Sequence, residues 1–174
     1  MELLLGAGSR RVKQLTWGGR AEWSALTTLD INADHKPDVV HDLTVLPLPF
    51  ADDTFDEIHA YEVLEHTGQQ GDWRFFFAQF SEFWRILKPD GVLMGTSPHW
   101  GSAWAWMDPG HTRAMGPEML IFLMQPQYDA QVGITPMTDY RFVYKADFDV
   151  RLADVKGGQF SYIIQAVKPS RCTR

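Results

Sequence analysis

The sequence predicts an α/β fold: a Rossmann-like, doubly wound, mostly parallel sheet with a C-terminal antiparallel hairpin. Two observations lead to this prediction. Short apolar segments of strand length alternate with helical or loop segments along most of the chain, which is the pattern of a parallel sheet covered by crossovers. The last two apolar segments are joined by a Gly-rich turn, which predicts a hairpin at one edge of that sheet.

Length and composition limit the class of protein. A chain of 174 residues with 45% apolar residues fits one globular domain over residues 1–174. No segment approaches the ~20 apolar residues of a membrane span, and the N-terminus lacks the features of a signal peptide. Because Cys172 is the single cysteine, no disulfide can form within the chain, and we expect a cytoplasmic protein.

The charge pattern bears on partners. The net charge is −6, and Lys and Arg form no run, which argues against a nucleic-acid groove. We therefore expect a small-molecule or carrier-bound substrate and no nucleic acid. The sequence leaves the oligomeric state open.

The elements of the N-terminal half follow in order. Residues 3–5 predict a short first strand, and a helix is expected to begin over residues 9–15 before Trp17-Gly18-Gly19 interrupts it. Further strands are expected at 25–31, 38–42 and 55–61.

The second half contains the most regular helix pattern. Apolar residues recur with helical spacing between Asp72 and Leu87, at Trp73, Phe76, Phe77, Phe80, Phe83, Trp84 and Leu87. The segment 88–91, Lys-Pro-Asp-Gly, predicts a turn before a strand at 92–97. A Trp-rich loop (Trp100, Trp104, Trp106), a helix from Pro117 to about Met124, and strands near 142–152 and 160–167 complete the chain.

Small and acidic residues follow the ends of the predicted strands. Gly6-Ala7-Gly8 ends the first strand, Asp30 ends the second, Asp42 follows the third and Glu62 follows the fourth. Ligands of open α/β sheets bind at these carboxyl ends, and a carboxylate can accept two hydrogen bonds from a ribose diol. Gly6-Ala7-Gly8 read alone is equally compatible with a tight turn between strand and helix.

These residues, in this order, resemble the class I S-adenosylmethionine-dependent methyltransferases, and in particular the small bacterial type 11 group. The resemblance extends over residues 3–124 and rests on the segments 5–8, 29–32, 38–43, 48–55, 64–66, 87–91 and 108–111. It implies a class I methyltransferase fold that is trimmed at its N-terminus, with S-adenosylmethionine as the cofactor. It assigns to cofactor binding the residues Gly6, Ala7, Gly8, Asp30, Ile31, Asp42, Leu43 and Glu62.

Within this resemblance, Asp30 is expected to hold the ribose, Asp42 and Leu43 the edge of the adenine, and the glycine turn the methionine part. The sequence departs from the family pattern at two positions. Leu4 stands where an acidic residue is usual, and Arg10 stands where a third Gly is usual. Arg10 or Arg11 is then a candidate for contact with the cofactor carboxylate.

Two histidines are candidates for a catalytic base. His99 and His111 belong to the segment in which this fold gathers its substrate pocket, whereas His66 is interpreted as structural. A base is optional, because transfer from a sulfonium depends mainly on alignment and exclusion of water. No metal is expected, since His59, Glu62 and His66 match no defined ligand spacing.

The function predicted is methyl transfer to an unidentified acceptor, with the Trp-rich loop as a lid. The alternative is a methyltransferase-like protein that binds the cofactor without turnover, as a regulatory or partner subunit. A nicotinamide-dependent oxidoreductase would also place an acid at a strand end, but it requires a fuller Gly-x-Gly-x-x-Gly, which Arg11 interrupts.

Overall fold

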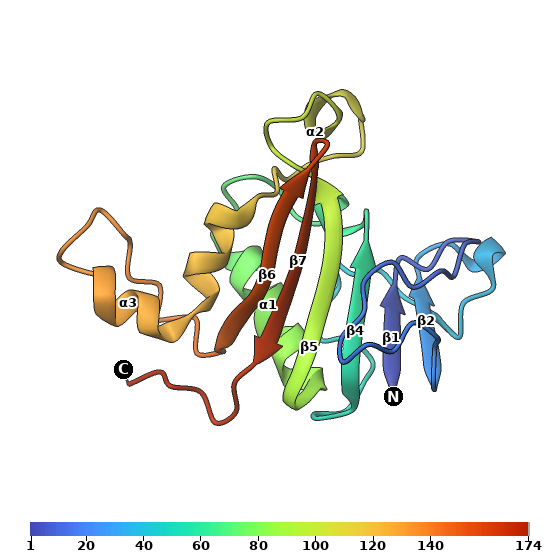
Figure 1. Cartoon of the computed structure of the whole chain (residues 1–174), viewed down its shortest axis with the longest axis horizontal. Coiled ribbons are helices and arrows are strands. Elements are labelled where there is room, and N and C mark those ends of the chain that lie inside the picture. The colour runs from blue at the N-terminus through green and yellow to red at the C-terminus, as the bar shows by residue number, and fades with distance from the viewer. Residues whose placement is uncertain (174) are drawn as a thin grey trace.

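The computed structural model describes residues 1–173, which form one seven-stranded sheet with the strand order β3-β2-β1-β4-β5-β7-β6. The first five strands in chain order are parallel, and β7 runs antiparallel to both β5 and β6. The strands are β1 (Glu2–Leu5), β2 (Leu26–Asp30), β3 (Val39–Val40), β4 (Phe55–Tyr61), β5 (Leu87–Pro98), β6 (Phe148–Lys156) and β7 (Gln159–Ala166). The predicted doubly wound sheet with a C-terminal hairpin is confirmed (Figure 1).

The helices are few and short apart from one. They are η1 (Ala33–His35), η2 (Leu64–His66), α1 (Trp73–Ile86), α2 (Trp104–Met107), η3 (Pro117–Leu123) and α3 (Gln125–Gln131), where η denotes a 3-10 helix. No helix among residues 1–173 is both long enough and apolar enough to cross a membrane.

Helix α1 forms where its apolar spacing predicts it. The Asp72 side chain accepts a hydrogen bond from the Phe75 amide at 3.0 Å and caps the first turn. Its apolar face (Phe77, Phe80, Phe83, Ile86) is buried in the main core, behind the sheet in Figure 1.

Three element predictions need correction. The segment 88–91 is part of β5 and not a turn: the register against β4 shifts between Phe55 and Glu57, and the extra residues are taken up there with Asp90 at a φ of 63°. The helix expected at 117–124 is 3-10 and is followed by α3. Strand β6 begins at Phe148, later than expected, because Tyr144 is fully buried against Phe77 of α1.

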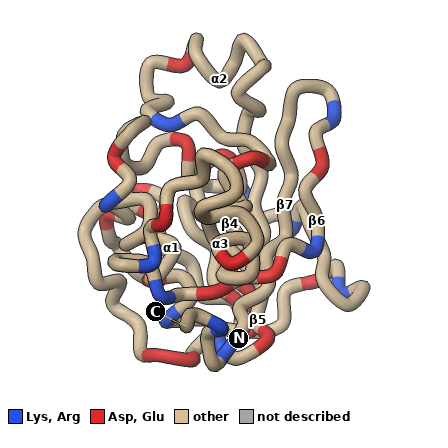
Figure 2. The backbone as a smooth tube through the Cα atoms, turned by 90° about the vertical axis from the view of Figure 1, so that its left-hand side faces the viewer, with Lys and Arg blue, Asp and Glu red and all other residues tan. Residues whose placement is uncertain are grey.

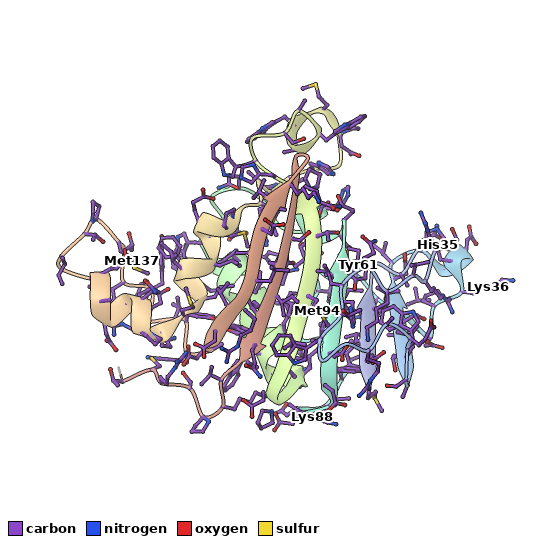
Figure 3. The ribbon with its side chains drawn as sticks, viewed as in Figure 1. His35, Lys36, Tyr61, Lys88, Met94 and Met137 are labelled. Carbon is purple, nitrogen blue, oxygen red and sulfur yellow. The ribbon has the colours of Figure 1, made fainter. Side chains whose placement is uncertain are left out.

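The helix expected to begin over residues 9–15 does not form. Instead, the segment 9–25 has no regular secondary structure and crosses the front of β1 and β4 as the dark blue coil in Figure 1. Figure 3 places Tyr61 and Met94 on this front side, over β4 and β5. The sequence pattern failed here because the contacts of this segment with the sheet are mainly polar, so they have no apolar period.

A buried polar network joins this segment to the sheet. Glu2 and Glu57 are register partners on β1 and β4, and the ammonium of Lys13 lies 3.2 Å and 2.8 Å from their carboxylates. The Lys13 and Glu2 side chains are each 1% exposed. His59 Nε2 lies 3.1 Å from Glu57, and its Nδ1 lies 2.6 Å from the Tyr61 hydroxyl. Burial lowers the pKa of His59 to about 4, so the ring is neutral at pH 7.

This network makes stability depend on pH. Between pH 6.5, the ordinary pKa of histidine, and about 4, the unfolded chain binds a proton at His59 that the folded protein does not. The free energy of unfolding therefore falls as the pH falls through this window, by up to ~1.4 kcal/mol per pH unit. We predict that His59→Gln removes this component.

The measurement is urea unfolding of both proteins between pH 4 and 8, because titrating groups that do not interact with His59 cancel in the difference. The difference in unfolding free energy should change below pH 6.5 and stay constant above pH ~7.5. A difference that stays constant throughout would show that His59 is protonated normally in the folded protein.

Candidate functional site

The predicted cofactor residues meet at the carboxyl edge of β1, β2 and β4. This edge is formed by the turn after β1, the segment from β2 into η1, the loop after β3 and η2 after β4. Parallel pairing of β1 with β2 and with β4 brings all of these segments to the same edge.

Gly6 lies where β1 and β4 end side by side. Its φ is 57°, and a Cβ at this position would lie 2.4 Å from Cγ2 of Val63. Two carbon atoms that are not bonded to each other cannot approach so closely, so a larger residue would push the two strand ends apart. Gly8 also has a positive φ of 53°, but a Cβ there would meet nothing closer than the Arg10 amide nitrogen at 4.0 Å.

Asp30 is 6% exposed and is held by several donors. Its Oδ2 accepts from the Gly8 amide at 2.7 Å and lies 3.2 Å from His35 Nδ1, and its Oδ1 accepts from the Asn32 amide at 2.8 Å. Although burial alone would raise its pKa, these hydrogen bonds lower it below the usual value, so Asp30 is ionised. A carboxylate has about four acceptor positions, which leaves one on Oδ1.

Asp42 and Leu43 follow β3 and line the same cavity as Asp30. Asp42 Oδ1 accepts from the Thr44 amide and hydroxyl, both at 2.8 Å, and these bonds lower the pKa of Asp42. Leu43 is 7% exposed and belongs to the main core. The carboxylate therefore faces the loop with one oxygen held and with an apolar neighbour beside it.

Two cavities meet at Gly6. The first has a volume of about 290 Å³ and is lined by Gly6, Leu29, Asp30, Ile31, His41, Asp42, Leu43, Thr44, Val63, His66 and Thr67. The second has a volume of about 500 Å³ and is lined by Leu4, Gly6, Ala7, Gly8, Ser9, Arg10, Val12, Gln14 and Tyr61. Val63 and Thr67 are not among the residues predicted from the sequence, and His66 is interpreted there as structural. Their position directly after β4 is a signal that could have indicated all three.

The two arginines after the glycine turn have different places. Arg10 lines the second cavity. Arg11 instead donates to the backbone carbonyls of Lys36 and His35, at 2.7 Å and 3.3 Å, and so ties the segment to η1. Figure 3 shows His35 and Lys36 beyond β2, at the side of the sheet that ends in β3. Of the two candidates, Arg10 is the one beside a cavity.

Glu62 belongs to neither cavity lining. It has a φ of 54°, and its carboxylate accepts from Gln159 Nε2 at 3.0 Å. A non-glycine residue in this conformation is strained, and such strain often occurs at functional edges. Glu62 ties the end of β4 to the start of β7.

The structure separates the two histidine candidates. The Nδ1 of His99 accepts from the Gly101 amide at 3.1 Å, and its ring packs on Trp100. His111 lies instead against His66, with their ring centroids 4.6 Å apart. Only His111 is thus brought to the end of β4.

The Trp-rich loop stands above the ends of β5–β7 in Figure 1. The indole nitrogen of Trp100 donates to Glu118 at 3.2 Å. The indole nitrogen of Trp106 donates to the Trp100 carbonyl at 2.8 Å. Trp104 is 71% exposed and Met107 is 69% exposed. The outer surface of the loop is therefore apolar.

Several buried polar atoms on the inner side of this edge have no hydrogen-bond partner among residues 1–173. They include both carboxylate oxygens of Glu65, Ser97 Oγ, Arg113 Nη2 and Tyr162 Oη. Burial, together with the negative Glu62 and Asp108, raises the pKa of Glu65 to about 8. Burial lowers the pKa of Arg113 to about 10. Unpartnered buried groups are costly, so their concentration next to a cavity edge indicates a binding region.

A third cavity adjoins this region. It has a volume of about 190 Å³ and is lined by Gln69, Gln70, Gly71, Asp72, Trp73, Phe76, Phe77, Arg113, Ala114, Met119, Phe122 and Tyr140. Five of its twelve lining residues are aromatic, and the lining includes one cation, Arg113, and one anion, Asp72, which suits an apolar or planar group. Thr67 in the first cavity and Gln69 in the third are separated only by Gly68.

Comparison with known proteins bears on the family and the fold. The type 11 family of methyltransferase domains matches residues 10–95. No curated protein matches the chain.

Solved structures of methyltransferases share the fold. An S-adenosylmethionine-dependent methyltransferase from Archaeoglobus fulgidus has 15% identity and a TM-score of 0.56, over 94% of this chain and 85% of that one. One from Methanosarcina mazei has 17% identity and a TM-score of 0.53, over 95% and 92%. A Haloferax volcanii complex between the Trm112 methyltransferase activator and a candidate methyltransferase has 16% identity and a TM-score of 0.54, over 95% and 82%.

The strand order defines a Rossmann-like sheet, and a cavity lies at the carboxyl ends of β1, β2 and β4. With the family match over residues 10–95, the chain has the fold of the class I S-adenosylmethionine-dependent methyltransferases.

The contact between Gly6 and Val63 can be tested by stability. Gly8→Ala should lose about 1–2 kcal/mol, the cost of a side chain in the left-handed region. Gly6→Ala should lose a further 1–3 kcal/mol or so, because its Cβ also collides with Val63.

Urea unfolding of Gly6→Ala, Val63→Ala and the double variant measures the coupling, with Gly8→Ala as the matched control. The double variant should recover the additional loss. If Gly6→Ala costs no more than Gly8→Ala, the close approach of the strand ends does not require glycine.

Proposed function

We propose that this protein transfers the methyl group of S-adenosylmethionine to a small-molecule acceptor. The observation that carries the proposal is the single cavity in which Asp30, Asp42 and the β1 turn meet. Its residues fit an adenosine group: Asp30 offers an acceptor position to a ribose hydroxyl, Asp42 accepts from an exocyclic amine, and Ile31, Leu43 and Val63 offer apolar contact.

The positions of the remaining predicted residues around the two cavities indicate the role proposed for each. Ala7 and Gly8 belong with Gly6 to the second cavity, on the side of the methionine part, where Arg10 is a candidate partner for its carboxylate. Glu62 stands at the end of β4, where the sulfonium would pass. Bound S-adenosylmethionine supplies an activated methyl group, so the chain's own residues have mainly to align the acceptor and exclude water.

The acceptor class follows from charge and shape. Lys and Arg are interspersed with Asp and Glu in Figure 2, and the net charge is −6, which disfavours a long polyanion. The aromatic cavity with Arg113 lies next to the adenosine cavity and is the proposed acceptor site. The proposed catalytic contribution of His99 is weaker than that of His111, because the lone pair of His99 Nδ1 is already engaged by Gly101.

A second candidate function is a cofactor-binding subunit without turnover. Two observations favour it: segment 9–25 forms no helix after the glycine turn, and three hydrogen bonds already occupy Asp30. The Haloferax volcanii neighbour is a complex with a protein partner, which is compatible with this alternative. Cofactor binding without transfer to any acceptor in a broad screen would favour the subunit.

Calorimetry of S-adenosylhomocysteine binding tests the cofactor site. Asp30→Ala should weaken binding by roughly 10- to 150-fold, the loss of one charge-assisted hydrogen bond of about 1.5–3 kcal/mol. Asp42→Ala should cost less, since apolar contacts still hold the adenine.

His35→Ala is the matched control, because it removes a neighbour of Asp30 and leaves the carboxylate. It should bind at least as tightly as the parent. Unfolding temperatures without ligand establish that each variant is folded. If a folded Asp30→Ala variant binds as the parent does, the assignment of the ribose to Asp30 is wrong.

The lid role of the Trp-rich loop has a separate test. Trp104→Ala should reduce turnover by about 10- to 100-fold at saturating cofactor, because misalignment and water entry slow transfer. Its affinity for S-adenosylhomocysteine should stay unchanged. Ile134→Ala, at another exposed apolar residue (79% exposed), is the control and should change neither. A Trp104→Ala variant with full turnover would make the loop a structural element.

A further inference from the structure

We propose that Glu65, His66 and His111 form a binding site for a divalent transition metal, with Zn²⁺ as the first candidate. One ligand atom from each of the three residues lies within 4.8 Å of the others. The proposal does not rest on methyl transfer, although a metal bound to His111 Nε2 would occupy the lone pair that a catalytic base needs. Two histidines and one carboxylate are a ligand set that transition metals prefer over Mg²⁺ or Ca²⁺.

The carboxylate is the first observation. Glu65 is 1% exposed, and neither of its oxygens has a hydrogen-bond partner among residues 1–173. A buried carboxyl group without hydrogen-bond partners is costly, and a bound cation would give both of its oxygens a partner. The nearby Glu62 and Asp108 add negative charge that favours a cation at the same place.

The orientation of the two imidazole rings is the second observation. His66 Nδ1 lies 3.1 Å from the Gly110 carbonyl, and His111 Nδ1 lies 2.9 Å from the Trp104 carbonyl. A carbonyl only accepts, so each ring carries its proton on Nδ1 and keeps the Nε2 lone pair for a ligand. Metal-binding histidines are typically oriented by such a backbone carbonyl behind the ring.

The backbone brings these groups together from two distant segments. Glu65 and His66 belong to η2 after β4, and His111 follows α2. The amides of Thr112 and Arg113 both donate to the Glu65 carbonyl, at 2.9 Å and 3.1 Å, so the loop is attached to η2 beside the site.

Gly110 and Asp108 complete the surroundings. A Cβ on Gly110 would lie 2.9 Å from His66 Nδ1, so glycine permits the close approach of the loop. Asp108 Oδ2 lies 3.9 Å from His111 Nε2, which is too far for a hydrogen bond. The Nε2 lone pair of His111 therefore remains available.

Three protein ligands leave at least one coordination position for water or another ligand, as in catalytic rather than structural zinc sites. His66 also lines the proposed adenosine cavity, so the metal would lie at the cavity wall. Glu62 is not a proposed ligand, because its carboxylate is held by Gln159.

The experiment uses the full chain after dialysis against a chelator, without S-adenosylmethionine. Zn²⁺ is titrated by calorimetry in competition with a chromophoric chelator, and Co²⁺ is titrated by visible absorption, which reports ligation. We expect one equivalent to bind and the unfolding temperature to rise with metal concentration. His111→Ala, His66→Ala and Glu65→Gln should each weaken Zn²⁺ binding by more than about 100-fold, since loss of an outer partner alone costs roughly 10- to 100-fold.

His41→Ala is the matched control, because His41 lines the same cavity but lies outside the cluster. It should keep the parent's affinity for Zn²⁺. Unfolding temperatures without metal show which variants fold. If an alanine variant does not fold, Glu65→Gln remains as the test, because it preserves the size of the side chain. The proposal is overturned if the parent binds Zn²⁺ no better than folded His111→Ala, or if His41→Ala loses as much affinity as His111→Ala. Because no cofactor is present, either result leaves the cofactor-binding test unaffected.

Discussion

The fold depends on the ion pairs that Lys13 makes with Glu2 and Glu57. These two carboxylates are register partners on β1 and β4, so the centre of the sheet carries adjacent negative charges on its front side. Removing one partner of a buried ion pair typically costs about 3–5 kcal/mol, because the other charge is left unpaired. The return of segment 9–25 over the sheet is therefore required, although it forms no helix and has little apolar surface to bury.

That requirement extends to the cofactor edge. The segment leaving β1 donates from Gly8 to Asp30 and from Arg11 to the carbonyls of η1, so the strand ends of β1 and β2 are joined by polar contacts. A helix normally placed after this turn would hold the edge by packing. Here, hydrogen bonds and the Lys13 network do so, and the walls of both cavities are set by the same segment.

The other half of the edge is organised around η2. Its Glu65 carbonyl accepts from the amides of Thr112 and Arg113, and its Glu65 and His66 side chains lie beside His111. His66 also lines the proposed adenosine cavity, so the proposed cofactor site and the proposed metal site share this short helix. Displacement of η2 would affect both sites, and Val63, which contacts Gly6, directly precedes this helix.

The sequence by itself determined the strands, the amphipathic helix α1 and the acidic positions at strand ends, because alternation, helical periodicity and turn residues are local properties. That Asp30, Ile31, Asp42 and Leu43 line one cavity with Gly6 also followed from the parallel order of the strands. Only the tertiary structure decided that Val63 abuts Gly6, that Lys13 replaces a helix over β1 and β4, and that His111 reaches Glu65. These contacts join residues far apart in the chain through polar groups and close packing, which produce no periodic signal along the sequence.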